Sequence, residues 1–227
     1  MNFIFMAENS YKTMDKNKKI LRIINLLKKK YPEVKCSLDF QDNFQMMISA
    51  MLSAQCSDAA VNKVTPKLFA RFRSPKDFAD AAVEEIESYI KTLGLYKTKA
   101  KNIKNTSEIL VQKYNGQVPD EYDDLIELPG IGRKIATVIL STCFGKLEGI
   151  TIDTHNIRLN QRLGLTKFKD AKRIEQDLLP IVPKKYWDEY SLLMIYHGRE
   201  TCKARKPLCE ECVLNKICPK TRVEKKL

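Results

Sequence analysis

Four cysteines near the C-terminus have the spacing of ligands to a single metal centre. They are separated by six, two and five residues, in the order Cys202, Cys209, Cys212 and Cys218. Four thiolates at such spacings can surround a tetrahedral zinc ion or an iron–sulfur cluster. Most structural zinc sites use two separate short-spaced pairs, whereas this array has one, so its spacing weakly favours iron–sulfur. The segment that carries the cysteines is too short and polar to bury a core, so we expect the metal to organise it.

The loop between the first two cysteines carries three cations, Lys203, Arg205 and Lys206. A turn fixed by a metal would present such side chains to phosphate groups. A charged loop that is merely exposed to solvent could have the same sequence. The spacing alone therefore does not decide between phosphate contact and simple solvation.

A second feature is the glycine-containing turn of the segment 128–134, with the sequence LPGIGRK. Gly130 and Gly132 have no Cβ, so the backbone can come close to a ligand there. The amides of the helix that follows point outward at its positive end, which is a natural phosphate site. A generic tight turn is the alternative, and the basic pair Arg133 and Lys134 favours phosphate binding.

Helical periodicity dominates the elements that must position these residues. Only the segment 149–152 alternates as a strand would, and it is too short to carry a sheet. A short helix over 123–127 precedes the glycine turn, so residues 123–144 are expected to form a helix–hairpin–helix motif. The sequence predicts an all-α fold, with further helices over 17–30, 44–55, 59–72, 74–93, 97–114, 131–144, 154–163, 170–181 and 184–197.

The charge of the chain indicates a polyanionic partner. The 227 residues include 40 Lys+Arg against 28 Asp+Glu, which gives a formal net charge of +12 and a pI near 9.3. Nucleic acid and an acidic membrane surface are both candidates, and lysines that only solvate the protein are the plain alternative.

The longest apolar stretch, 135–145, has about half the length of a membrane span, and no secretion signal is recognisable. We expect a soluble, monomeric protein of the cytoplasm, associated with the nucleoid and with no membrane partner.

Together these motifs resemble those of the endonuclease III family. Its members are DNA base-excision glycosylases of the helix–hairpin–helix/Gly-Pro-Asp superfamily. The resemblance covers about residues 17–218. It rests on the hairpin, the cysteine spacing, and the segments LSAQ at 52–55, LGLY at 93–96, IDTH at 152–155 and HGR at 197–199.

The resemblance implies two helical domains, with damaged double-stranded DNA bound in the cleft between them. A six-helix barrel would cover about 37–147. Residues 15–36 and 148–227 would form a four-helix domain that holds a [4Fe-4S] cluster on the four cysteines. Residues 1–14 are expected to be disordered.

The resemblance also assigns roles to individual residues. Lys134 matches the catalytic lysine of the family, and Asp153 matches its catalytic aspartate. Gln55 would fill the gap left by the extruded base, and Leu95 would wedge opposite it. Contacts to DNA are expected from Gly130, Gly132, Arg133, His155, Lys203, Arg205 and Lys206.

These residue types suit the chemistry. Attack at the sugar C1′ needs a neutral amine, and basic neighbours and a helix N-terminus disfavour the charged form of a lysine. A carboxylate near C1′ stabilises the cationic sugar, although Asp153 could equally be the N-cap of the helix after it. For His155 a structural, phosphate or water contact is favoured over acid–base catalysis.

The expected activity is therefore removal of damaged pyrimidines through a lysine imine, followed by β-elimination that nicks the strand 3′ to the abasic site. The adenine-specific branch carries a glutamate before the LSAQ segment, where this chain has Ser49, Ala50 and Met51. A glycosylase for uracil or thymine opposite guanine, which has tyrosine in place of Lys134, and a non-enzymatic metal-dependent DNA-binding protein are the alternatives. Cys36, Cys56 and Cys143 are interpreted as packing positions, and His197, before Gly198 at a helix end, is interpreted as a capping or packing residue and not as a metal ligand.

Overall fold

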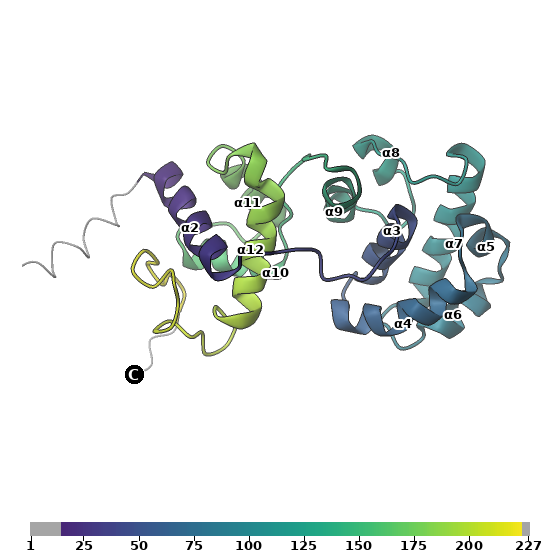
Figure 1. Cartoon of the computed structure of the whole chain (residues 1–227), viewed down its shortest axis with the longest axis horizontal. Helices are drawn as coiled ribbons and strands as arrows, with labels where there is room; N and C mark the ends of the chain where they lie inside the picture. Colours follow the sequence, from purple (N-terminus) through teal and green to yellow (C-terminus); the bar gives the residue numbers. More distant parts are fainter. Residues whose placement is uncertain (1–14, 224–227) are drawn as a thin grey trace, which may run out of the picture. The chain divides into compact units, whose positions relative to one another are not determined.

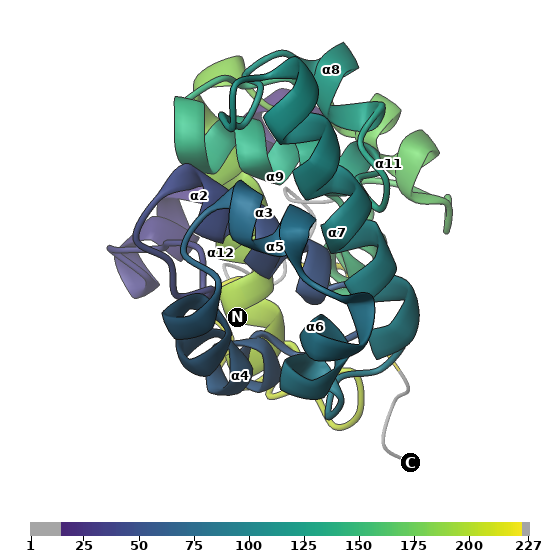
Figure 2. The same cartoon turned by 90° about the vertical axis from the view of Figure 1, so that its right-hand side faces the viewer.

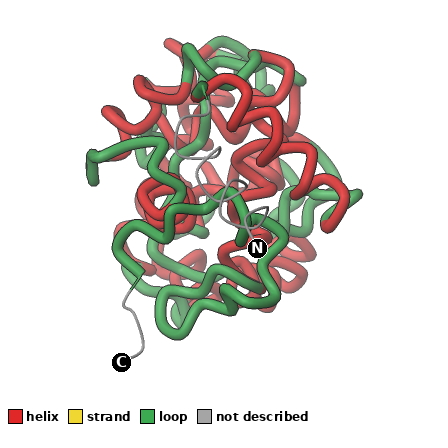
Figure 3. The backbone as a smooth tube through the Cα atoms, turned by 90° about the vertical axis from the view of Figure 1, so that its left-hand side faces the viewer, coloured by secondary structure: helices red, strands yellow, loops and turns green. Residues whose placement is uncertain are grey.

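The computed structural model describes residues 15–223, and the predicted disorder over 1–14 lies outside these residues. Within the described range the chain consists of helices, turns and loops without a β-strand (Figure 3). The prediction of an all-α fold is therefore confirmed. No helix in the described part is long and apolar enough to span a bilayer.

The described residues divide into two compact units. The first unit is formed by residues 15–35 and 149–223. It contains α2 (Lys16–Lys30), α10 (Thr154–Arg162), α11 (Ala171–Leu178), the 3-10 turn η1 (Lys184–Tyr186) and α12 (Trp187–Glu200) (Figure 1).

The core of the first unit forms around α12, which packs against both α2 and α10. The apolar face expected on α2 is completely buried in this core. From α12 the core receives Tyr190, Leu193 and Met194, and from α10 it receives Leu159. The segment α2 thus joins a unit whose other helices come from the C-terminal part of the chain, because its apolar stripe needs their cover.

The second unit is Cys36–Glu148. It contains α3 (Asn43–Leu52), α4 (Asp58–Arg71), α5 (Pro75–Asp80), α6 (Val83–Ile90), α7 (Tyr96–Lys113), α8 (Tyr122–Ile126) and α9 (Arg133–Phe144). The apolar helix α3 is almost entirely buried and packs against α4, α7 and α9. The long helix α7 runs alongside α5 and α6 (Figure 2).

The helix predicted over 74–93 is two helices, so the prediction of one continuous segment is wrong. The backbone is extended at Ala81 and Ala82, between α5 and α6. A capping box of Ser74 and Asp77 starts α5. The ammonium of Lys104 on α7 caps the other end of α5, since it donates to the carbonyls of Ala79 and Ala81 at 2.5 and 2.9 Å. This long-range contact satisfies the carbonyls freed by the break.

Further boundaries differ from the prediction: the helix expected over 170–181 ends at Leu178, and the one expected over 131–144 begins at Arg133. The helix expected over 44–55 ends at Leu52, so Gln55 lies in the turn after α3 and not in its last turn. The helix expected over 184–197 begins as the 3-10 turn η1 and continues to Glu200 as α12. Short 3-10 turns of this kind are common at helix N-termini.

Candidate functional site

The glycine turn between α8 and α9 is held by contacts with α7. The carbonyl of Pro129 accepts a hydrogen bond from Thr106 Oγ1 at 2.9 Å. Gly130 has φ +83°, and a Cβ on it would lie 2.8 Å from Asn102 Nδ2. Gly132 has φ −97° and caps α9, and a Cβ there would meet no atom within 4 Å. A glycine is thus required at position 130, because the backbone is left-handed and a Cβ would clash with Asn102. At Gly132 the space that a Cβ would take, next to the start of α9, is open.

The two basic residues of this motif lie on the exposed first turn of α9. No side chain caps this helix, so the amides at its start keep their capacity to bind a ligand. The Arg133 guanidinium lies 5.7 Å from the centre of the Tyr122 ring and donates to the Tyr122 hydroxyl at 3.4 Å. Within residues 15–223, no hydrogen bond or ion pair holds the Lys134 ammonium, so the expected nucleophile is available to a ligand.

Asp153 is the N-cap of α10, which agrees with the structural interpretation of this residue. Its Oδ1 accepts hydrogen bonds from the backbone amide of Asn156 at 2.8 Å and from Asn156 Nδ2 at 3.0 Å. Asn156 is completely buried, and its Nδ2 also donates to the carbonyl of Ser191 on α12 at 3.3 Å. The cap therefore fixes the orientation of the carboxylate and does not compete with a catalytic role.

His155 lies against the HGR segment of α12. Its Nδ1 is 3.1 Å from Nη2 of Arg158, and because a guanidinium only donates, Nδ1 is the accepting nitrogen. Burial lowers the pKa of His155 below its ordinary value, chiefly through desolvation. A Cβ on Gly198 would lie 2.5 Å from Nδ1, so this position has no room for a larger residue. His155 is thus a neutral side chain with Nε2–H as its donor.

The turns that carry Gln55 and Leu95 lie side by side in the second unit. Both residues have left-handed backbone, with φ 56° and 58°, which is uncommon outside glycine. Leu95 is 56% exposed, and Gln55 is also exposed. The side chain of Cys56, next to Gln55, lies against the backbone of Gly94, next to Leu95, with Sγ 4.0 Å from its carbonyl oxygen. The structure therefore brings these two predicted site residues together on adjacent turns.

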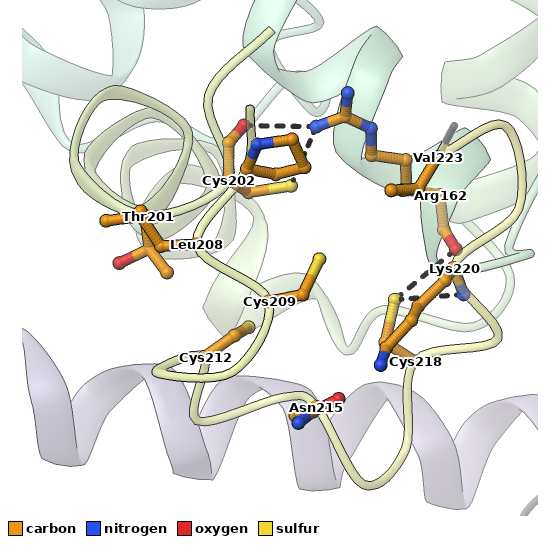
Figure 4. Close-up of a pocket in the computed structure, with 11 residues that line it drawn as sticks. Arg162, Thr201, Cys202, Leu208, Cys209, Cys212, Asn215, Cys218, Lys220 and Val223 are labelled. Atoms are coloured by element: carbon orange, nitrogen blue, oxygen red, sulfur yellow. Dashed lines mark hydrogen bonds between the residues drawn. The ribbon is translucent and has the colours of Figure 1, made fainter. Parts of the chain in front are cut away.

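The four clustered cysteines line one pocket at the end of the first unit (Figure 4). Its atom-free volume is about 320 Å³, part of it open to solvent. Within the described chain, no group of three or more His, Cys, Asp or Glu side chains is arranged to hold a single metal ion. The three cations of the loop between the first two cysteines are exposed, as the phosphate-contact hypothesis requires.

Backbone amides point at two of the cysteine sulfurs. Leu214 N donates to Cys212 Sγ and Lys220 N donates to Cys218 Sγ, each at 3.4 Å. Burial raises the pKa of the Cys212 thiol to about 11, with neighbouring thiols adding to the effect, and burial also raises that of Cys218. Several thiolates need a multiply charged cation to coexist here, and amide hydrogen bonds to sulfur are typical of iron–sulfur sites. The residues present therefore fit a cluster held by Cys202, Cys209, Cys212 and Cys218.

Arg162 of α10 is a residue that sequence reasoning missed. It is only 7% exposed, and its Nη1 donates to Cys202 Sγ at 3.2 Å and to the carbonyl of Lys203 at 2.7 Å. Its Nη2 donates to the carbonyl of Ala204 at 3.0 Å. One guanidinium thus holds the start of the cysteine loop to α10. Its only sequence signal is a position in an amphipathic helix, which is shared by many surface arginines.

His197 is buried, as its packing interpretation predicts, and it also contacts a cysteine of the site. It is 1% exposed, and its Nε2 lies 3.3 Å from Cys212 Sγ while its Nδ1 lies 3.3 Å from the hydroxyl of Tyr31. Burial lowers the pKa of His197 to about 4, so the ring is neutral at physiological pH. It supports the cysteine loop from α12.

We expect Arg162→Met to lower the stability of the cysteine loop by about 3 kcal/mol, because several buried carbonyls lose their charged donor. For a chain of this size the loss corresponds to a fall of roughly 10 °C in the temperature at which visible cluster absorbance disappears. The matched control is Arg173→Met, which removes an exposed arginine of α11. Equal transition temperatures for the two variants would show that Arg162 does not hold the loop.

Comparisons with known proteins agree with these observations. Residues 48–184 match the family model of the HhH-GPD superfamily base excision DNA repair proteins, and residues 202–218 match the iron-sulfur binding domain of endonuclease III. Endonuclease III of Synechocystis sp. is 46% identical over 92% of this chain and 95% of its own. The Escherichia coli enzyme is 40% identical over 90% of this chain and 96% of its own. The iron–sulfur alternative, a [4Fe-4S] cluster, is therefore confirmed over zinc.

Solved structures give the same result. A non-covalent endonuclease III–DNA complex and a trapped endonuclease III–DNA covalent intermediate each align with a TM-score of 0.86 and 40% identity, over 91% of this chain and 97% of theirs. A thermostable thymine-DNA glycosylase, with a TM-score of 0.79 and 21% identity, shares the fold. The chain belongs to the endonuclease III family, within the HhH-GPD superfamily of base excision DNA repair proteins.

Proposed function

We propose that this chain is a base-excision-repair DNA glycosylase and abasic-site lyase in which Lys134 is the nucleophile and Asp153 the stabilising carboxylate. The observation that carries the assignment is the position of Lys134. It is an exposed lysine without an ion pair among the described residues, at the start of the helix that follows the hairpin. The chain also aligns along nearly its whole length with a trapped endonuclease III–DNA covalent intermediate.

The reaction begins with attack of the neutral Lys134 amine on C1′ of the damaged nucleotide. The N–C1′ bond forms as the glycosidic C–N bond breaks, and the base leaves with the electron pair and gains a proton. Opening of the sugar ring gives an imine, which acidifies the C2′ hydrogen. Loss of that proton and cleavage of the C3′–O bond nick the strand on the 3′ side. Water then releases the lysine.

Asp153 supports this step electrostatically. As the glycosidic bond breaks, positive charge develops on the sugar, and a fixed carboxylate nearby lowers the energy of that transition state. Asn156 holds Asp153 Oδ1 through two hydrogen bonds, so the carboxylate needs little reorganisation during the reaction. A carboxylate in this role contributes through charge and position.

Extrusion of the damaged base is assigned to Gln55 and Leu95. Flipping a nucleotide costs a few kcal/mol of stacking and pairing. An exposed leucine can wedge into the duplex, and an amide can bond the edge of the orphaned base. Both residues lie on tight turns with left-handed backbone, which limits their freedom before binding.

Duplex binding is assigned to the hairpin and to the cysteine loop. The phosphate contacts would come from backbone amides around Gly130 and Gly132 and from Arg133, with His155 donating through Nε2–H. The exposed loop cations Lys203, Arg205 and Lys206 would add a second contact to the backbone. The cluster would hold that loop in place, and the net charge of +12 favours association with a polyanion. We infer that the protein acts on nucleoid DNA in the cytoplasm.

The direct test is base release and strand nicking on duplexes that carry one thymine glycol, one uracil opposite guanine, or no lesion. We expect release and nicking on the first duplex and none on the undamaged one. Activity restricted to uracil opposite guanine would favour a mismatch glycosylase. Tight binding without reaction on any duplex, by a colourless protein, would contradict both the enzymatic assignment and the cluster.

A further inference from the structure

A buried lysine of the second unit has a cysteine sulfur as its partner. Lys99 on α7 is 6% exposed, and its Nζ lies 3.0 Å from Cys56 Sγ. Within residues 15–223 this sulfur is the hydrogen-bond partner of the ammonium. A buried ammonium without a charged or hydrogen-bonding partner is costly, so this contact is a structural link and not an incidental approach.

The link joins the two turns that carry the proposed base-extruding residues. Cys56 directly follows Gln55, and the amide of Lys99 donates to the carbonyl of Leu95 at 3.0 Å. The Cys56 sulfur also lies 3.9 Å from the position that a Cβ on Gly94 would take. The sulfur thus lies close to both turns, against the backbone of Gly94 and in contact with Lys99.

We propose that Cys56 is a covalent modification site for soft carbon electrophiles, and that its modification disables base extrusion. Cys56 is partly exposed, as reaction with a small reagent requires. The thiolate is the nucleophilic form of cysteine, and the Lys99 ammonium lies 3.0 Å from this sulfur. With an alkyl halide, the S–C bond forms as the carbon–halogen bond breaks, and the halide leaves with the electron pair.

The other cysteines provide the contrast that makes the site selective. Burial raises the pKa of the Cys143 thiol to about 11, so it is protonated at neutral pH, and no lysine is placed against it among the described residues. Cys36 and Cys56 both pack against the core of the second unit and are both partly buried, so burial does not distinguish these two. The four cysteines of the C-terminal pocket are occupied by the cluster in the folded enzyme.

An adduct on Cys56 changes both turns, because the sulfur lies against Lys99 and against the backbone of Gly94. The added group breaks the contact with Lys99 and pushes the turns of Gln55 and Leu95 apart. This consequence rests on the proposed roles of Gln55 and Leu95. The selective reaction at Cys56 does not depend on them.

The test treats the cluster-containing enzyme with iodoacetamide at neutral pH and follows adducts by peptide mass spectrometry. We expect Cys56 to react first, at least about tenfold faster than Cys143. We expect Lys99→Met to slow the reaction at Cys56 about tenfold, and Lys101→Met, which removes an exposed lysine of the same helix, to leave it unchanged. Equal rates in these two variants, or faster reaction at Cys143, would overturn the proposal.

Activity separates this proposal from the proposed function. The parent treated until Cys56 is fully modified should lose base release from the damaged duplex, with the visible absorbance of the cluster unchanged. Cys56→Ser, whose hydroxyl can still accept a hydrogen bond from Lys99, should release the base as the untreated parent does and should be insensitive to the reagent. Full activity of the modified parent would overturn the effect on base extrusion, whereas an untreated parent without activity would contradict the proposed function itself.

Discussion

Replacing Lys134 with alanine should abolish strand nicking and lower base release from a damaged duplex by at least about 10³-fold, because the reaction loses its nucleophile. The side chain is exposed on the first turn of α9 and bonded to no other described residue, so its removal leaves the fold intact. Binding to the damaged duplex should stay within a few-fold of the parent, since Arg133 and the hairpin backbone remain. Single-turnover nicking and equilibrium binding measure the two effects separately.

A matched control for this variant is Lys101→Ala, which removes an exposed lysine of α7 in the same unit. It should nick as the parent does. If Lys134→Ala nicked at the parental rate, or if both variants lost the same amount of activity, Lys134 would be a charge contact and the imine would form elsewhere.

Asp153→Asn should lower base release by about 10² to 10³-fold and leave duplex affinity nearly unchanged. The amide oxygen can still accept the two hydrogen bonds of Asn156, so the cap of α10 survives while the negative charge near the sugar is lost. The thermal midpoint of this variant should therefore match that of the parent. Asp153→Ala loses the cap as well and should cost about 1 kcal/mol of stability.

The comparison of these two substitutions separates catalysis from capping. A fall in activity for Asp153→Ala alone, in step with its stability, would show that the residue serves only as an N-cap. Parental base release in Asp153→Asn would remove the electrostatic role of this carboxylate.

Much of the fold was predictable because its signals are local. The apolar stripe of α2 recurs at helical spacing, and all of it is buried. The hairpin was recognisable from its glycines and the following basic pair. The four cysteines were recognisable as metal ligands because they cluster at short spacings. The chain has no recognisable secretion signal, and such a cluster is then typical of a metal centre.

The differences from prediction come from contacts between residues far apart in the sequence. Ser74 to Leu93 is helical in its periodicity, yet Lys104 of α7 stabilises a break between α5 and α6. The backbone at Gln55 is left-handed, and no local sequence motif predicts this conformation.

Residues that support the candidate site through tertiary contacts were also beyond reach of the sequence. Asn156 and Arg162 are ordinary polar positions of a helix until α12 and the cysteine loop pack against them. The pairing of Cys56 with Lys99 links positions 43 residues apart, and the sequence offers no reason to associate them. Charged and polar groups inside a protein acquire partners only through the fold.

The most direct test of the central claim is borohydride trapping on a duplex with one thymine glycol, comparing the parent with Lys134→Ala. Borohydride reduces an imine to a stable amine, so a covalent protein–DNA adduct reports the proposed intermediate. We predict an adduct with the parent that is absent from the variant, and peptide mapping that places it on Lys134. An adduct of equal yield in the variant, or base release by the parent without any adduct, would contradict imine chemistry at Lys134.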